Sequence, residues 1–194
     1  MLPLYLLRKM KLRLIQSNCS AINSIYIYEN FLDDLQYLNL LKSHISEYTN
    51  KPNDLDYKTN VFAKMTNWKK LLENQDFNKI HQSIAETLYN TINLRNPCPN
   101  QKIEFFFDNS WGMKHDEGDY TQDHIHNFAY FSGSFYFEVP TPTMMWFEDY
   151  QQDVELKDNM LVLFPGLCKH RVTAHTGQKP RYSMAFNMTL KVVD

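Results

Sequence analysis

The chain contains 194 residues, of which 20 are Lys or Arg and 22 are Asp or Glu. Charges this evenly balanced give no strong basic field, so the composition provides no bulk attraction for nucleic acid. Hydrophobic residues make up 43% and aromatic residues 14% of the chain, which excludes a disordered protein. No apolar run approaches the roughly 18–20 residues that a membrane helix requires. The length predicts one domain over residues 1–194.

The three cysteines, Cys19, Cys98 and Cys168, are widely spaced and odd in number. They predict neither a disulfide framework nor a metal-binding pair, so we expect a reducing, cytoplasmic location. The apolar block Leu2–Leu7 precedes its positive charges, whereas a secretory signal places positive charge first. We therefore expect no secretory signal, and Met10 is a candidate for the natural start.

The first hundred residues mix two kinds of pattern. Lys11–Gln16 and Ser24–Tyr28 alternate apolar with polar residues, which predicts short strands. In Phe31–Tyr48 and Asp76–Leu94 the apolar positions recur at steps of three and four, which predicts two amphipathic helices. The polar stretch between them, residues 50–74, is expected to be a loop.

The residues before the first of these helices contain a start signal. Asn30 is the expected cap, because asparagine accepts hydrogen bonds from the free backbone N–H groups of a first turn. Asp33 and Asp34 are expected inside that turn, where the helix dipole favours negative charge.

After Pro99 the helical spacing disappears, and short β-like runs separated by turns take over. The expected strands are Lys102–Phe107, Ser110–Lys114, Tyr130–Val139, Thr143–Phe147, Val154–Lys157, Met160–Phe164, His170–Thr173 and Tyr182–Leu190. Many short strands favour a sandwich or jelly roll over alternating βαβ units. The predicted fold is α+β and mainly β: a double-stranded β-helix formed by residues 101–194, with the helices of a support region, residues 1–100, packed on one face.

The segment Asp123-His124-Ile125-His126 contains the most informative local pattern. On a strand, residues two apart project to the same face, so both imidazoles can reach one ion. His170, expected on a facing strand, is the leading candidate for a third ligand. Such a set leaves metal coordination positions open, as a non-haem iron site requires. An H-x-H pair also occurs without a metal, so the residues that follow His170 matter.

Eleven residues after His170 stands Arg181, followed by Tyr182 and Ser183. A guanidinium beside a hydroxyl is well suited to binding a carboxylate in a buried pocket. The alternative is that Arg181 is only a strand-edge charge after a turn. Arg171 is a competing anion binder, but alternation places it on the opposite face from His170.

Together these residues resemble the Fe(II)/2-oxoglutarate-dependent dioxygenases, and more narrowly a group of 2-oxoglutarate-Fe(II) oxygenases found in bacteria and phages. The resemblance covers roughly Phe105–Leu190. The motifs that carry it are Gly118-Asp119-Tyr120, His124-Ile125-His126, Ser132-Gly133, Phe135-Tyr136-Phe137, Leu161-Val162-Leu163-Phe164-Pro165, His170-Arg171-Val172, Arg181-Tyr182-Ser183 and Phe186-Asn187.

The resemblance implies a hydroxylase that uses 2-oxoglutarate and O2 as co-substrates, with an unidentified prime substrate. It implies that His124, His126 and His170 hold Fe(II). It also implies that the far carboxylate of 2-oxoglutarate meets Arg181 and Ser183, and that Tyr120 or Tyr136 donates to a 2-oxoglutarate carboxylate. His115 is expected to line the entrance.

One residue departs from the family pattern. The usual second ligand is a carboxylate, and here the matching position is His126. Three interpretations stay open: a three-histidine centre, a triad completed by a carboxylate such as Asp149, Glu148 or Asp123, or no iron site. Alternation favours the first, because Asp123 points away from the face that His124 and His126 share.

Two other functions remain alternatives. A cupin-type metalloenzyme that does not use 2-oxoglutarate fits Gly118 and the H-x-H pair, but Tyr130 and Phe131 occupy the places where a cupin glutamate is expected. The second alternative is a non-catalytic jelly-roll binding or structural module, in which the histidines have no catalytic role. No membrane partner is expected, and the N-terminal helices are candidates for a homodimer face.

Overall fold

Two β-sheets lie face to face in the computed structural model, which describes residues 10–16, 23–51, 59–95 and 102–193. The larger sheet has the strand order β1 (Lys11–Gln16), β2 (Ser24–Glu29), β10 (Met160–Pro165), β7 (Phe131–Glu138), β12 (Arg181–Val193), β5 (Lys102–His115) and β4 (Lys64–Met65). The smaller sheet has the order β3 (Val61–Phe62), β6 (Tyr120–His124), β11 (His170–Val172), β8 (Met144–Phe147) and β9 (Gln152–Glu155).

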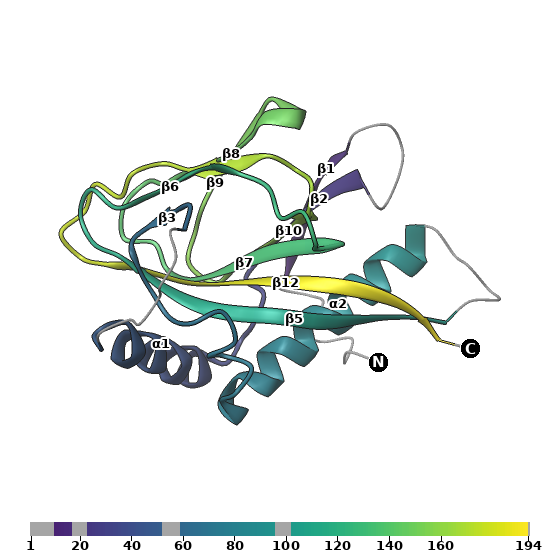
Figure 1. Cartoon of the computed structure of the whole chain (residues 1–194), viewed down its shortest axis with the longest axis horizontal. Coiled ribbons are helices and arrows are strands. Elements are labelled where there is room, and N and C mark those ends of the chain that lie inside the picture. The colour runs from purple at the N-terminus through teal and green to yellow at the C-terminus, as the bar shows by residue number, and fades with distance from the viewer. Residues whose placement is uncertain (1–9, 17–22, 52–58, 96–101, 194) are drawn as a thin grey trace.

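Helices α1 (Leu35–Thr49) and α2 (Asn78–Arg95) cover the outer face of the larger sheet, and the smaller sheet lies on its other side (Figure 1). Short 3-10 turns precede α2 at Gln75–Phe77 and follow β8 at Glu148–Tyr150. The predicted fold, a mainly β double-stranded β-helix with helices on one face, is confirmed. No helix within the described ranges is long and apolar enough to cross a membrane.

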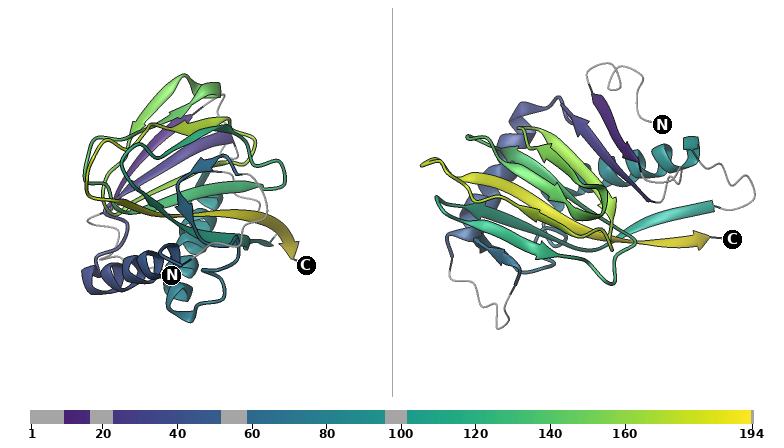
Figure 2. Two further views of the ribbon diagram at one scale, coloured as in Figure 1. Left: turned by 60° about the vertical axis from the view of Figure 1, so that its left-hand side comes forward. Right: turned by 90° about the horizontal axis from the view of Figure 1, so that it is seen from above.

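Residues before position 100 do more than support the roll. Strands β1 and β2, in purple, extend the larger sheet at one edge (Figure 2). Strand β4 extends the same sheet at its other edge, and β3 extends the smaller sheet. The strands β3 and β4 lie in the stretch that the sequence predicts to be a loop. Each of them is only two residues long, which is too short for alternation to be recognised in the sequence.

The first helix begins later than predicted. Asp34 is its N-cap, because its side chain accepts a hydrogen bond from the backbone N–H of Tyr37 at 3.0 Å. The prediction of Asn30 as the cap is wrong: Asn30 has φ of 54° and belongs to a turn after β2. The helix therefore has no acidic residue in its first turn. The apolar stripe predicted from Phe31 to Ile45 is present only in its later part. Leu38, Leu41 and Ile45 are buried, whereas Leu35 is 69% exposed and Phe31 lies before the helix.

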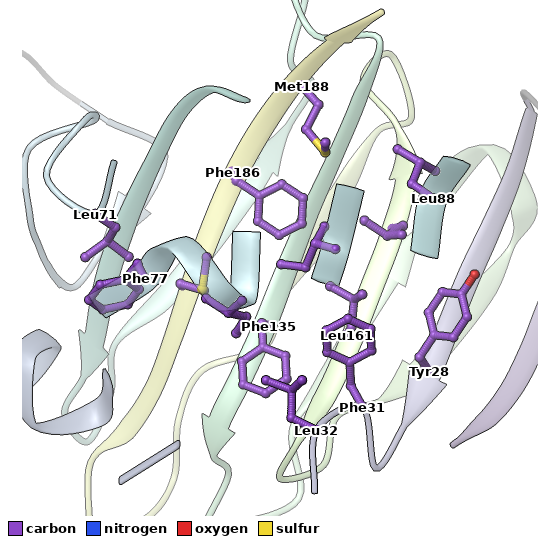
Figure 3. Packing of buried hydrophobic residues seen from close by; sticks show 14 of the residues in the cluster. Tyr28, Phe31, Leu32, Leu71, Phe77, Leu88, Phe135, Leu161, Phe186 and Met188 are labelled. Carbon is purple, nitrogen blue, oxygen red and sulfur yellow. The ribbon is translucent and has the colours of Figure 1, made fainter. Parts of the chain in front are cut away.

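The outer face of the larger sheet and the two helices form one hydrophobic core. Figure 3 shows Phe135, Leu161 and Phe186, from adjacent strands, packed in the same layer, with Leu88 of α2 nearby. All four side chains are fully buried. Each contributes roughly 1.5–3 kcal/mol relative to an exposed position. This core holds the sheet in place while its other face is left to line an internal cavity.

Strand β5 changes face part-way along its length. Asn187 of β12 is opposite Asn109, and Met188 is opposite Phe107, so Asp108 forms a β-bulge. Phe107 packs with the helix-side core, whereas Trp111 after the bulge lines the space between the sheets. The two strands predicted at 102–107 and 110–114 are therefore one strand, and the predicted break between them is the bulge.

A buried histidine in the helix-side core gives the fold a testable pH dependence. His81 of α2 has its Nε2 3.0 Å from the hydroxyl of Ser110, and burial lowers the pKa of His81 from 6.5 to about 4. The unfolded chain takes up a proton near its ordinary pKa of about 6.5, so stability is fully present above that pH and falls as the pH drops toward 4.

We expect His81→Gln, which cannot titrate, to flatten this dependence. Between pH 7 and pH 4 the wild-type protein should lose about 3 kcal/mol more unfolding free energy than the variant. Urea unfolding at a series of pH values measures this difference. If unfolding free energy fell equally with pH in the two proteins, the lowered pKa assigned to His81 would be contradicted.

Candidate active site

Three histidine side chains converge inside the roll. His170 of β11 is directly opposite His124 of β6, and their ring centroids are 4.2 Å apart. His126 follows two residues after His124, and its ring centroid is 5.2 Å from that of His170. One nitrogen from each ring lies within 4.8 Å of the others. Within the described ranges this is the one group of three or more His, Cys, Asp or Glu side chains close enough to hold a metal ion.

The convergence does not arise from simple strand alternation. Strand β6 ends at His124, and His126 lies in the turn beyond it. The register of β6 and β11 shifts between two pairs, in which His124 is opposite His170 and Thr121 is opposite Val172. Two residues of β6 lie between the pairs, whereas only one residue of β11 does, so β6 contains a β-bulge. Thr121 and His124 therefore both line the cavity.

Arg171 and Asp123 lie on the outer side of these strands, as alternation predicts. Arg171 faces away from the cavity, and its guanidinium lies 3.5 Å from the carboxylate of Asp123. Both side chains are substantially exposed. Asp123 is therefore paired on the outer surface, away from the imidazoles.

Hydrogen bonds fix how two of the rings are presented. The Nδ1 of His124 lies 2.8 Å from the carbonyl oxygen of Gln122, and the Nδ1 of His170 lies 2.9 Å from that of Cys168. A carbonyl oxygen only accepts, so each Nδ1 carries the proton and each Nε2 offers a lone pair. This is the arrangement that metal-binding histidines usually show.

Burial keeps all three imidazoles neutral at pH 7. It lowers the pKa of His124, lowers that of His126 to about 3 with a further contribution from His124, and holds that of His170 well below its usual range. Neutral imidazole is the form that binds a metal ion, so no proton has to be displaced.

A close backbone approach sets the place of His126. Its N–H donates to the carbonyl of Gly166 at 2.7 Å. A Cβ at position 166 would lie 2.1 Å from the carbonyl oxygen of Ala129 and 2.9 Å from that of His126. Only glycine fits there without moving the turn that carries His126.

The carboxylates considered as alternative ligands are engaged elsewhere. Asp149 accepts a hydrogen bond from the backbone N–H of Lys169 at 3.0 Å. Glu148 forms an ion pair with the ammonium of Lys169 at 2.6 Å. With Asp123 paired to Arg171, none of the three joins the histidine cluster.

The histidines line a cavity between the two sheets. Along β12 the inward residues are Arg181, Ser183 and Ala185, and along β5 they are Trp111, Met113 and His115. Other lining residues are Val61, Thr121, Gly133, Ser134, Tyr136, Met145, Phe164 and Val172. The cavity is mostly apolar, with polar groups concentrated around Arg181 and around the histidine cluster.

The polar groups around Arg181 are buried without partners. Arg181 is 1% exposed, and its Nε and Nη1 form no hydrogen bond with any described residue. The hydroxyl of Ser183 and both ring nitrogens of His115 are likewise buried and unpaired within that part of the chain. Burial lowers the pKa of Arg181, although an arginine remains charged at neutral pH. The sequence predicts Arg181 and Ser183 in the pocket but His115 at its entrance, whereas the side chain of His115 is only 2% exposed.

Tyr120 lies outside this cavity, so the sequence-based expectation for it needs correction. Its ring is 39% exposed and stacks on Phe62, with centroids 4.7 Å apart. Thr121 faces inward, so the adjacent Tyr120 must face outward. Tyr136, the other candidate, does line the cavity, and its hydroxyl lies 3.9 Å from the sulfur of Met145.

A wider, open groove adjoins the cavity and shares His126 with it. Its walls include Trp68, Asn109, Phe128 and Asn187. Phe128 is 95% exposed at the turn after His126. The histidine cluster therefore lies between the enclosed Arg181 end and an open end.

No protein-family model and no curated protein sequence matches this chain. Solved structures do. A prolyl-4-hydroxylase from Pseudomonas putida matches with a TM-score of 0.60 and 13% identity, over 84% of this chain and 91% of that one. The non-haem α-ketoglutarate-dependent epimerase SnoN of nogalamycin biosynthesis matches with a TM-score of 0.65 and 10% identity, over 85% of this chain and 77% of that one.

The viral collagen prolyl hydroxylase of Paramecium bursaria Chlorella virus-1, solved with 2-oxoglutarate, matches with a TM-score of 0.58 and 13% identity, over 84% of this chain and 94% of that one. This chain has the fold of these oxygenases. The resemblance inferred from the sequence is thereby confirmed for the fold, and coverage of 84% of this chain extends well beyond the stretch, roughly Phe105–Leu190, that the motifs cover.

The donor set fits a first-row divalent metal ion. Two nitrogens on one ion lie about 3–4 Å apart when each metal–nitrogen bond is about 2.0–2.1 Å, so shifts of about 1 Å close the cluster onto an ion. The three neutral imidazoles leave the remaining coordination positions for small ligands.

We expect Gly166→Ala to lower metal affinity about 10- to 100-fold, although glycine is not a ligand, because the added methyl displaces the turn of His126. Titration of the purified protein with Ni(II) measures this. Leu167→Ala, a change at the exposed neighbouring residue, is the matched control and should bind like the wild type. Unchanged affinity in the glycine variant would show that His126 is not held as described.

Proposed function

We propose that this protein is a non-haem Fe(II)- and 2-oxoglutarate-dependent oxygenase. The observation that carries the proposal is one cavity with two chemically different ends. Three neutral imidazoles lie on and just beyond strands of the smaller sheet, and a buried guanidinium on the larger sheet has its Nε and Nη1 unpaired among the described residues. The first end suits a metal ion with open positions, and the second suits a carboxylate. 2-Oxoglutarate has a keto-acid group that chelates metal and a second carboxylate that needs such a partner.

In this proposal His124, His126 and His170 hold Fe(II). When bound, the iron and 2-oxoglutarate supply the oxidising chemistry, in which O2 is consumed, 2-oxoglutarate is decarboxylated to succinate and the prime substrate is hydroxylated. The backbone carbonyls of Gln122 and Cys168 orient two of the rings. Because all three ligands are neutral, the metal keeps its full charge for the anionic co-substrate.

Arg181 and Ser183 bind the far carboxylate. The guanidinium offers two parallel N–H donors to a carboxylate, and the hydroxyl adds a third donor two residues along the same face of β12. Apolar side chains such as Met113, Met145 and Phe164 surround the space between carboxylate and metal. They exclude water, which strengthens each polar contact inside.

The prime substrate approaches through the open groove. Arg181 and Asn187 both face inward from β12, and their six-residue separation spans roughly 20 Å at about 3.3 Å per residue. A 2-oxoglutarate molecule held at Arg181 therefore leaves the groove free. His126 lines both spaces, so a molecule in the groove reaches the metal centre.

The solved relatives support this function. SnoN is described as α-ketoglutarate-dependent, and the viral prolyl hydroxylase was solved with 2-oxoglutarate. A cupin-type enzyme that does not use 2-oxoglutarate would have no need for the buried Arg181, and a non-catalytic module would need neither end. Cytoplasmic location and dimerisation through the helices stay predictions.

Anaerobic titration with Fe(II) and then 2-oxoglutarate tests the proposal. We expect one equivalent of Fe(II) and a visible metal-to-ligand charge-transfer band when 2-oxoglutarate is added. Arg181→Ala should raise the 2-oxoglutarate concentration needed for half of this band at least about 10-fold, because a charged hydrogen bond is lost, while Fe(II) binding is unchanged.

Arg171→Ala is the matched control, since it removes an arginine from the outer face of the adjacent sheet and should leave the titration unchanged. Iron binding without any band would point to a metalloenzyme of the cupin type. Absence of metal binding would leave only the non-catalytic module.

A further inference from the structure

His115 is the last residue of β5 and is opposite Arg181, the first residue of β12. Directly opposite residues of antiparallel strands project to the same face, with Cβ atoms about 4.5–5.5 Å apart. The side chain of His115 therefore enters the cavity beside the guanidinium, and it is 2% exposed.

Both ring nitrogens of His115 are without a hydrogen-bond partner in the part of the chain that the structure describes. The other buried histidines differ. His81 pairs with Ser110, His170 with the carbonyl of Cys168, and His175 with the carbonyl of Lys179 at 2.7 Å. Leaving a buried polar group unpaired is unfavourable, so a ring left this way at a cavity indicates that a ligand supplies its partner.

The neighbourhood of His115 decides which kind of ligand fits. Burial, and then the charge of Arg181, hold the pKa of His115 well below its usual range, so the ring is neutral at pH 7. A neutral imidazole has one N–H donor and one acceptor nitrogen. A carboxylate has about four lone-pair sites, and Arg181 with Ser183 fills at most three of them.

We propose that His115 binds the far carboxylate of 2-oxoglutarate together with Arg181 and Ser183, by donating its ring N–H to a carboxylate oxygen. This inference rests on the proposed function and adds a ligand-binding residue to it. The binding pocket then draws on two adjacent strands, β5 and β12, rather than on β12 alone.

Binding measurements with the Ni(II)-loaded protein test this without turnover. 2-Oxoglutarate is one probe, and oxalate, which can chelate the metal but has no far carboxylate, is the other. Isothermal titration gives the Kd of each. We expect His115→Leu to raise the Kd of 2-oxoglutarate roughly 10- to 100-fold and to change that of oxalate less than about twofold.

Two conservative variants identify the nitrogen involved. The side-chain amide introduced by His115→Asn stands near the position of Nδ1, and the amide introduced by His115→Gln stands near the position of Nε2. One of the two should recover most of the lost affinity, and the nearly unchanged oxalate affinity of the leucine variant shows that this variant is folded. His81→Gln, which changes a buried histidine on the other face of the larger sheet, is the matched control and should bind both probes like the wild type.

The outcomes separate the two proposals. If wild-type protein binds Ni(II) and oxalate but not 2-oxoglutarate, the proposed function fails and the role of His115 fails with it. If wild type binds 2-oxoglutarate and all three His115 variants bind it equally well, only the His115 inference is overturned. Equal loss of 2-oxoglutarate and oxalate affinity in every variant also overturns it, because His115 would then act on the metal end.

Discussion

The burial of the Arg181 guanidinium between two sheets is the constraint on which the site depends. A charge taken out of water without a paired partner costs several kcal/mol, and the apolar core on the helix side has to offset this cost. A carboxylate that entered the cavity would supply the missing partner. Burial of His115 in the same cavity, and then the charge of Arg181, hold the pKa of His115 well below its usual range and keep its imidazole neutral. The stability of the fold and the chemistry of the cavity are therefore linked through one side chain.

Two β-bulges connect the sequence to this arrangement. The bulge at Asp108 turns the later part of β5 over, so that Trp111 and His115 face inward while Phe107 packs against the helices. The bulge in β6 brings Thr121 and His124 to the same face. If the bulge in β5 were absent, strict alternation would turn His115 toward the helix-side core. If the bulge in β6 were absent, it would turn either Thr121 or His124 toward the outer surface.

The elements that depend on local periodicity were predictable from the sequence. The helices follow from apolar spacing, and most strands of the roll follow from alternation and turn residues. The cap at Asp34, the short strands β3 and β4, and the single long β5 were not, because they depend on turn geometry or pairing with distant segments. Alternation along one strand predicted that His124 and His126 lie close together, and they do. The reason is only partly right, because the strand ends at His124 and His126 lies in the turn that follows.

In the candidate site, too, some features could be predicted from the sequence and others could not. The histidine cluster and the inward direction of Arg181 and Ser183 could be inferred from residue types and their spacing. The outward position of Tyr120 and the burial of His115 without a partner among the described residues could not be inferred, because both depend on which face of a strand meets the cavity. Residue type indicates the chemistry that a side chain can perform, whereas its burial and partners show whether that chemistry is directed at a ligand.

The most direct test of the proposed oxygenase is a crystal structure of the protein grown anaerobically with Fe(II) and 2-oxoglutarate. We predict anomalous scattering from one iron bound by the ring nitrogens of residues 124, 126 and 170, with the keto-acid on the iron and the far carboxylate against the guanidinium of Arg181. An iron bound elsewhere, or a co-substrate carboxylate that leaves the guanidinium unpaired, would contradict this prediction.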